Sequence, residues 1–240
     1  MLACSNMERA RPASLRDPDA RGGFITIEGV EGAGKSTQVA RLAAWLGSVG
    51  IRAVATSEPD GSPLGAWVRR ILADRSPVDP LTECFLFATA RTEHVRRVIR
   101  PALEGGAVVV CDRYADSTVA YQGYGRGVPL EVVAELNRLA TDGLTPDLTL
   151  VLDLDPAEGL RRVGRRSPPP GARAAADVDP FERLGLEFHE RVRKGYRALH
   201  EREPGRIELI DAGRDADAVA AAIRRAVGAR LGLAGPEGAR

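Results

Sequence analysis

The chain has 240 residues, of which 44% are hydrophobic, and this suits one globular domain with a sizeable core or at most two small ones. It carries 34 basic and 33 acidic side chains, so the formal net charge of +1 excludes an overall attraction to nucleic acid or to a membrane surface. No apolar run approaches the roughly 20 residues of a membrane span, and we expect no secretory signal at the N-terminus.

The three cysteines, Cys4, Cys84 and Cys111, are widely spaced and form neither a CxxC pair nor a metal-binding pattern. An odd number of scattered thiols favours a reducing compartment, so we expect a cytoplasmic protein. Because Cys84 and Cys111 lie within apolar runs, we expect both to be small core residues.

The order of apolar and amphipathic segments predicts the fold. Residues 1–21 lack periodicity and predict a disordered leader, residues 22–233 form the expected domain, and residues 234–240 form a frayed tail. Strands are expected at 24–28, 51–56, 107–111, 148–154 and 207–210. Helices are expected at 36–49, 62–73, 80–104, 115–122, 130–141, 156–165, 180–202 and 215–231, and Pro101 could kink or end the third of them. Strands that alternate with helices predict an α/β fold with a parallel five-stranded sheet flanked by helices.

A glycine-rich loop joins the first strand to the first helix. The loop matches the motif G-x-x-x-x-G-K-[ST] in the strand-to-helix context that this motif requires. Its residues are Gly29-Val30-Glu31-Gly32-Ala33-Gly34-Lys35-Ser36. Glycines let backbone N–H groups converge on phosphate oxygens, and the helix N-terminus adds positive potential. We expect Lys35, one of only two lysines, to reach the β- and γ-phosphates of ATP, Ser36 to bind Mg²⁺, and Thr37 to complete the ATP site. The motif predicts a P-loop NTPase type of fold.

An acidic and a basic residue follow the third strand. Asp112 and Arg113 stand where open α/β sheets bind ligands, beyond the carboxyl ends of their strands. Asp112 is in position to organise Mg²⁺ together with Ser36, and Arg113 could hold an acceptor phosphate with two N–H groups. Alone, the pair could be a surface ion pair at a strand end. Beside a P-loop, it favours a kinase.

At this point the chain resembles the bacterial thymidylate kinases, from about Gly23 to Leu231. The matching segments occur in the family's order and spacing: FITIEGVEGAGKST, EPDGSPL, LFATARTEHV, VIRPALEGG, VVVCDRYADSTVAYQGYGRG, PDLTLVLDLDP and DPFERLGLEFHERV. The resemblance implies direct in-line transfer of the γ-phosphoryl group of ATP to dTMP, with Mg²⁺, in dTTP biosynthesis. It also implies a homodimer, and it implies neither a nucleic-acid nor a membrane partner.

The resemblance also implies roles for single residues. Phe87 would stack on the thymine ring, and Arg91 would donate to a carbonyl oxygen of the base; their i, i+4 spacing puts both on one helix face. Glu31 would lie near the sugar 3′-OH and Mg²⁺, and Tyr121 would crowd C2′ and disfavour ribonucleotides. The other expected substrate residues are Glu58, Arg113, Thr118 and Gln122. Without the resemblance, core packing is the better interpretation of Phe87, and a polar helix surface explains Thr118 and Gln122 equally well.

Arginines cluster after the fourth strand, and residues 161–182 are expected to form a lid. Its arginines are Arg161, Arg162, Arg165, Arg166 and Arg173. An arginine that reaches the transferring phosphoryl group can be worth ~10³ in rate, and we predict this role for Arg162 and Arg166, which share a helix face. Two positions depart from the family pattern: Pro180 replaces the arginine of a DRxE segment, and Asp60 replaces a glycine of the EPGG turn.

Three other functions stay open. The first is a kinase for another nucleoside monophosphate, against which the predicted thymine pocket argues. The second is a deoxynucleoside kinase, but Arg113 suits a phosphate acceptor better than the 5′-OH of a nucleoside. A nucleotide-binding protein without catalysis is supported only by Pro180 and Asp60. The histidines show no nucleophile or metal pattern, so we expect His94, His189 and His200 on helix surfaces or at an interface.

Overall fold

The computed structural model describes residues 22–73, 78–165, 181 and 184–232. The expected leader and tail lie outside the described residues. So do Arg166, Arg173, Pro180 and most of the expected lid.

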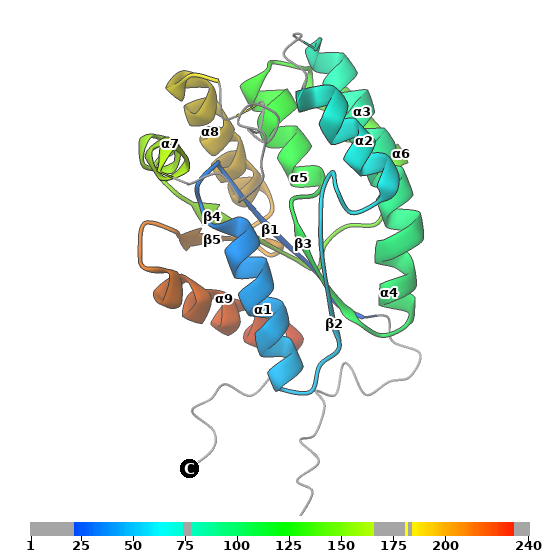
Figure 1. The fold of residues 1–240 in the computed structure, drawn as a ribbon, viewed down its shortest axis with the longest axis vertical. Coiled ribbons are helices and arrows are strands. Elements are labelled where there is room, and N and C mark those ends of the chain that lie inside the picture. Colours follow the sequence, from blue (N-terminus) through cyan, green and yellow to red (C-terminus); the bar gives the residue numbers. More distant parts are fainter. Residues whose placement is uncertain (1–21, 74–77, 166–180, 182–183, 233–240) are drawn as a thin grey trace, which may run out of the picture.

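Five parallel strands form one sheet in the order β2-β3-β1-β4-β5 (Figure 1). The strands are β1 (Phe24–Gly29), β2 (Ala53–Ser57), β3 (Val108–Asp112), β4 (Leu148–Asp153) and β5 (Ile207–Asp211). Each begins and ends within two residues of its predicted bounds, so the predicted parallel five-stranded sheet is confirmed. This order puts β1, which leads into the P-loop, between β3 and β4 at the centre of the sheet.

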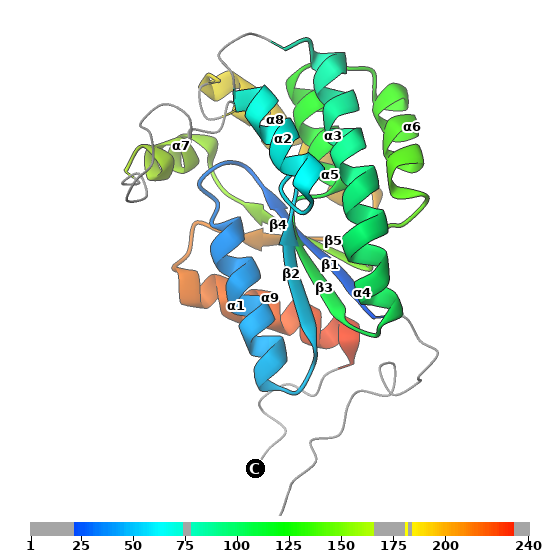
Figure 2. The ribbon, with the colours of Figure 1, turned by 45° about the vertical axis from the view of Figure 1, so that its right-hand side comes forward.

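Helices cover both faces of the sheet. They are α1 (Lys35–Ser48), α2 (Pro63–Ala73), α3 (Pro80–His94), α4 (Arg100–Glu104), α5 (Ala115–Thr118), α6 (Leu130–Thr141), α7 (Pro156–Gly164), α8 (Leu186–Arg202) and α9 (Ala216–Leu231). Two π-helical segments, η2 (Val95–Ile99) and η3 (Val119–Gly125), extend α3 and α5. In Figures 1 and 2, α1 and α9 lie side by side along one part of the sheet, whereas α2, α3 and α6 gather beyond the carboxyl ends of the strands.

Alternate residues of the strands point to opposite faces and fill two cores. In β3, Val108 and Val110 pack with residues of α1 and α9, whereas Val109 and Cys111 pack with residues of η2 and α4. Cys84 is also buried, so both predictions of core cysteines are confirmed. A sheet covered on both faces explains why its central strands are almost purely apolar.

One long predicted helix is confirmed in its bounds, and another begins later than predicted. The helix from Pro80 to Glu104 is continuous, and Pro101 does not end it, because the chain widens to a π-helix over the preceding turn. A π-turn relieves the clash that a proline ring makes with the carbonyl four residues earlier. The prediction of a helix from residue 180 was wrong at its start: α8 begins at Leu186, after Gly185 in an extended conformation. None of the helices in the described ranges is long and apolar enough to cross a bilayer.

Candidate active site

The P-loop connects β1 to α1 and is closed by its own lysine. The Lys35 ammonium donates hydrogen bonds to the carbonyl oxygens of Gly29, at 3.0 Å, and Val30, at 2.8 Å. Burial, together with the positive charge of Arg113, lowers the pKa of Lys35 to about 8. The lysine is thus held over the loop at the N-terminus of α1, where phosphate groups bind in this kind of motif.

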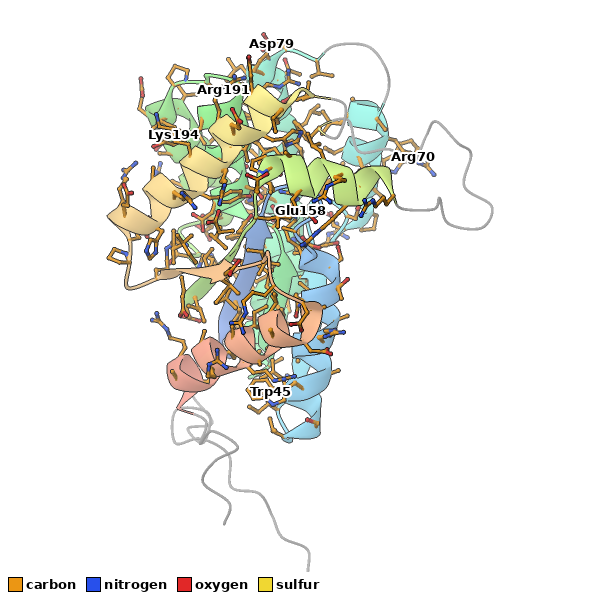
Figure 3. The ribbon with its side chains drawn as sticks, turned by 90° about the vertical axis from the view of Figure 1, so that its left-hand side faces the viewer. Trp45, Arg70, Asp79, Glu158, Arg191 and Lys194 are labelled. Carbon is orange, nitrogen blue, oxygen red and sulfur yellow. The ribbon has the colours of Figure 1, made fainter. Side chains whose placement is uncertain are left out.

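Helix α7 touches the P-loop directly. Gly32 has φ 73°, and a Cβ atom there would lie 2.2 Å from the carbonyl oxygen of Gly159 in α7. Figure 3 shows α7, which carries Glu158, lying across the N-terminal end of α1, far from Trp45 at the other end of that helix. The helix that leads into the expected lid therefore rests on the phosphate-binding loop.

Two oxygen-bearing side chains meet beside the loop. The Ser36 hydroxyl donates a hydrogen bond of 2.6 Å to Oδ2 of Asp112, the last residue of β3. A hydroxyl and a carboxylate are hard oxygen ligands of the kind that Mg²⁺ takes, with the rest of its shell supplied by water and phosphate, so the pair fits the expected ion. Glu31, the third predicted metal residue, instead makes contacts with Arg113, Tyr121 and His189.

Arg113 connects the P-loop to the neighbouring cleft. Its Nη2 lies 2.6 Å from Oε1 of Glu31, and its guanidinium lies over the ring of Tyr121, 4.7 Å from the centroid. The backbone of Arg113 has φ 67°, a sparsely populated conformation for a residue with a side chain. Burial opposes ionisation of Glu31, but Arg113, His189, Lys35 and Tyr121 outweigh it and hold the pKa of this carboxyl well below its usual range. Glu31 is therefore held ionised beside the Arg113 guanidinium.

A cleft of about 570 Å³ opens beside Arg113. All but one of the predicted substrate residues line it: Glu58, Phe87, Arg91, Arg113, Thr118, Tyr121 and Gln122. The exception, Glu31, contacts two of the lining residues, Arg113 and Tyr121. The Tyr121 hydroxyl lies 2.7 Å from Oε2 of Glu31. Thr118 and Gln122 are buried, so the alternative interpretation as helix-surface residues was wrong.

The far end of the cleft contains a buried charged network. Arg91, which is 2% exposed, donates to Oε2 of Glu58 at 2.9 Å and to Oδ1 of Asn137 at 2.7 Å. Phe87 lies one turn earlier and stacks on Phe181 with ring centroids 6.2 Å apart. An aromatic face and a guanidinium are thus brought to one wall, as their helical spacing predicted.

Glu28 is a buried carboxylate that the sequence analysis did not identify. It accepts hydrogen bonds from the backbone N–H of Tyr114 at 2.7 Å, from Ser117 Oγ at 2.5 Å and from the Tyr196 hydroxyl at 2.9 Å. Burial and the nearby Asp116 carboxylate raise the pKa of Glu28 to about 7. Glu28 fixes the backbone just after Arg113. The sequence signal that could have identified Glu28 is a charged residue within an otherwise apolar strand.

All three histidines were predicted on helix surfaces or at an interface, but two of them are buried inside the domain. His94 is fully buried, with Nε2 2.7 Å from Thr56 Oγ1 and Nδ1 3.3 Å from Oε1 of Glu58. His189, on α8, is 1% exposed and faces Glu31 of the P-loop. Both predictions were wrong because the helices that carry His94 and His189 pack against other elements on several sides. A single hydrophobic stripe in the sequence does not indicate such packing.

Of the expected lid, the structure describes residues 161–165 and Phe181. Arg162 donates to Oε1 of Glu158 at 2.7 Å and to the carbonyl oxygen of Ala212 at 3.1 Å. Arg166 lies outside the described residues. Asp60, the departure in the EPGG turn, accepts a hydrogen bond of 2.5 Å from Nε of Arg69, and Arg69 lines the cleft.

The matches to known proteins agree with this arrangement. A family model described as thymidylate kinase matches residues 27–223. The chain is 50% identical over 210 residues to the thymidylate kinase of Solidesulfovibrio magneticus, an alignment that covers 87% of this chain and 100% of that protein. It is 47% identical over 212 residues to the thymidylate kinase of Deinococcus radiodurans, covering 88% and 98% of the two chains. The crystal structure of thymidylate kinase from Ehrlichia chaffeensis superposes with a TM-score of 0.68 at 32% identity, covering 86% of this chain and 98% of that one. The chain belongs to the thymidylate kinase family, and its reaction is the phosphorylation of dTMP to dTDP.

Proposed function

We propose that this thymidylate kinase transfers the γ-phosphoryl group of ATP in line to the phosphate of dTMP, with the P-loop as the donor site and the cleft as the acceptor site. The observation that carries this assignment is the position of Arg113. It lines the cleft, and its Nη1 and Nη2 lie 3.4 Å from the carbonyl oxygen of Gly29 and 2.6 Å from Glu31 in the P-loop. A cation shared by both sites can neutralise charge where the two phosphates meet.

On the donor side, Lys35 and the backbone of residues 29–37 bind the ATP phosphates. Ser36 and Asp112 are the residues that would hold Mg²⁺, and the ion would neutralise charge on the β- and γ-phosphate oxygens. We assign Glu31 to the acceptor side rather than to the metal, because its two oxygens contact Arg113, Tyr121 and His189.

On the acceptor side, Phe87 stacks on the thymine and Arg91 donates to a base oxygen. Thr118, Gln122 and Glu58 complete the wall around the base, and Tyr121 limits the space at C2′. The acceptor is already an anion, so no general base is needed. The protein positions the two phosphates, neutralises their charge and excludes water.

The lid supplies further positive charge in this proposal. Arg162 lies on α7, the helix that contacts the P-loop through Gly159, and Arg166 follows four residues later in the sequence. Release of Arg162 from Glu158 would let it turn toward the transferring group. Single Arg162→Ala and Arg166→Ala variants test this by their effect on kcat; an unchanged kcat in both would contradict it.

We further propose a cytoplasmic homodimer. Large apolar side chains are exposed on the neighbouring helices α2, α3 and α6 (Figures 1 and 2): Leu64, Trp67, Ile71, Leu81, Phe85 and Leu139. Such a patch is typical of a protein–protein interface, and the buried thiols Cys84 and Cys111 suit a reducing compartment. Light scattering should give twice the chain mass for the wild type, and Phe85→Glu should shift it toward the monomer.

The function is tested by ADP release from ATP and Mg²⁺ against dTMP, dUMP, dCMP, dGMP, AMP, UMP and thymidine. We expect strong turnover with dTMP, weaker turnover with dUMP and little with the others. Lys35→Met should abolish turnover while leaving dTMP binding in place. Turnover that Lys35→Met leaves unchanged, or a preference for another acceptor, would refute the assignment.

A further inference from the structure

His189 is a buried polar residue that hydrogen bonding does not explain. It is 1% exposed, and neither ring nitrogen makes a hydrogen bond with any residue in the described ranges. Its Nδ1 lies 3.2 Å from Oε2 of Glu31, an ion-pair distance, although the orientation is not that of a hydrogen bond. A buried polar group left unpaired costs about 1–3 kcal/mol, so a purely structural role would be served better by an apolar ring.

The partner of His189 is a carboxylate at the junction of the two sites. Oε1 of Glu31 contacts Nη2 of Arg113 at 2.6 Å, and the Tyr121 hydroxyl lies 2.8 Å from Oε1 and 2.7 Å from Oε2. Arg113 therefore holds one oxygen of Glu31, and His189 stands beside the other. Arg113 and Tyr121 limit the rotation of the carboxylate about its last torsion, and His189 adds a further contact on Oε2 that restricts its orientation.

Close packing of α8 fixes the histidine in place. A Cβ atom on Gly125 in η3 would lie 2.6 Å from the ring of Phe188, and one on Gly195 in α8 would lie 2.9 Å from Tyr124. Arg191, labelled on α8 in Figure 3, also donates to the carbonyl oxygen of Gly125 at 3.0 Å. These contacts lock α8 onto the π-helical segment that carries Tyr121, so His189 and Tyr121 approach Glu31 from two elements that are held together.

We propose that His189 is a positioning residue that holds the Glu31 carboxylate against Arg113 and Tyr121, and so prepares the acceptor side of the site for dTMP. His189 acts through Glu31 and touches no phosphate itself. The inference rests on the proposed function of the cleft, because the affinity it explains is that for the acceptor nucleotide. It predicts that loss of His189 affects dTMP much more than ATP.

The test compares His189→Phe, which keeps the ring shape, with His189→Asn, which keeps a polar nitrogen close to the position of Nδ1. In the full chain we expect His189→Phe to raise KM for dTMP about tenfold and KM for ATP less than about twofold, without lowering the melting temperature. His189→Asn should recover most of the loss. His200→Phe, at the other end of α8, is the matched control and should leave KM for dTMP within about twofold of the wild type.

Several outcomes would overturn the proposal: an unchanged KM for dTMP in His189→Phe, an equal rise in both KM values with a lower melting temperature, or no recovery in His189→Asn. If the wild type itself fails to phosphorylate dTMP, the proposed function is refuted. The contact between His189 and Glu31 is then tested by a measurement that does not need turnover. The ¹⁵N resonance of His189 Nδ1 should shift in Glu31→Gln while that of His200 stays in place. The absence of such a shift would refute the contact.

Discussion

Gly32 of the P-loop and Gly159 of α7 meet backbone to backbone, with no side chain between them. A Cβ atom on Gly159 would lie 2.3 Å from the carbonyl oxygen of Glu31, and one on Gly32 would lie 2.2 Å from the carbonyl oxygen of Gly159. The contact couples the helix that leads into the expected lid to the P-loop. A displacement of α7 must therefore also displace the backbone of the P-loop.

Gly159→Ala should separate α7 from the P-loop. Because a methyl group cannot fit at 2.3 Å from a backbone oxygen, we expect kcat/KM for ATP to fall at least about tenfold and stability to fall by about 1–3 kcal/mol. Gly164→Ala is the matched control on the same helix, since a Cβ atom there meets nothing within 4 Å. Steady-state kinetics and urea denaturation check both variants. Equal activities would show that the close contact is not required.

Phe87→Leu should weaken dTMP selectively. Stacking of a base on an aromatic ring contributes about 1–3 kcal/mol, so KM for dTMP should rise about tenfold with KM for ATP unchanged. Phe85→Leu, at a side chain that is 53% exposed on the same helix, is the control and should behave as the wild type in kinetic assays. A loss of stability with no change in KM would instead make Phe87 a packing residue.

Arg91→Met should destabilise the whole domain. It removes the cation from Glu58, which is 6% exposed, and breaking a buried ion pair from one side costs about 3–5 kcal/mol. Arg97→Met removes an exposed arginine paired with Glu93 in the same long helix and should cost less than about 1 kcal/mol. Urea denaturation measures both. A similar stability for the two variants would contradict the role of the buried network.

Glu28→Gln should change how stability depends on pH. The folded pKa of Glu28, about 7, lies above its ordinary value of 4.5, so the folded state binds the extra proton between these values. The contribution of this group to stability is therefore greatest below about pH 4.5 and is lost as the pH rises through 7. Relative to that of Glu28→Gln, the unfolding free energy of the wild type should fall by about 3 kcal/mol between pH 5 and pH 8.

The measurement is urea denaturation across that pH range, with Glu208→Gln, an exposed carboxylate on β5, as the control. The control curve should run parallel to that of the wild type. Parallel curves for wild type and Glu28→Gln would mean that the Glu28 carboxyl titrates normally.

The parts of the site that local pattern determines were predicted from the sequence. The P-loop is one continuous segment that its motif identifies. The i, i+4 spacing of Phe87 and Arg91 predicted that they share a helix face, and both line the cleft. The contact between Glu31 and His189 joins residues far apart in the chain and depends on how α8 packs against η3, which no local pattern encodes. The helix from Pro80 to Glu104 was predicted in its bounds, but hydrophobic periodicity does not signal the π-turn that accommodates Pro101 within it.

The shared duties of Arg91 have a consequence for how this enzyme could evolve. The same guanidinium that lines the proposed acceptor cleft also donates hydrogen bonds to Glu58, Asn137, Thr118 and the backbone of Tyr114. A mutation that changed base preference at this position would therefore also unfold part of the population. New acceptor specificity would need a second, compensating substitution, and a lineage would have to acquire that substitution first or together with the change at Arg91.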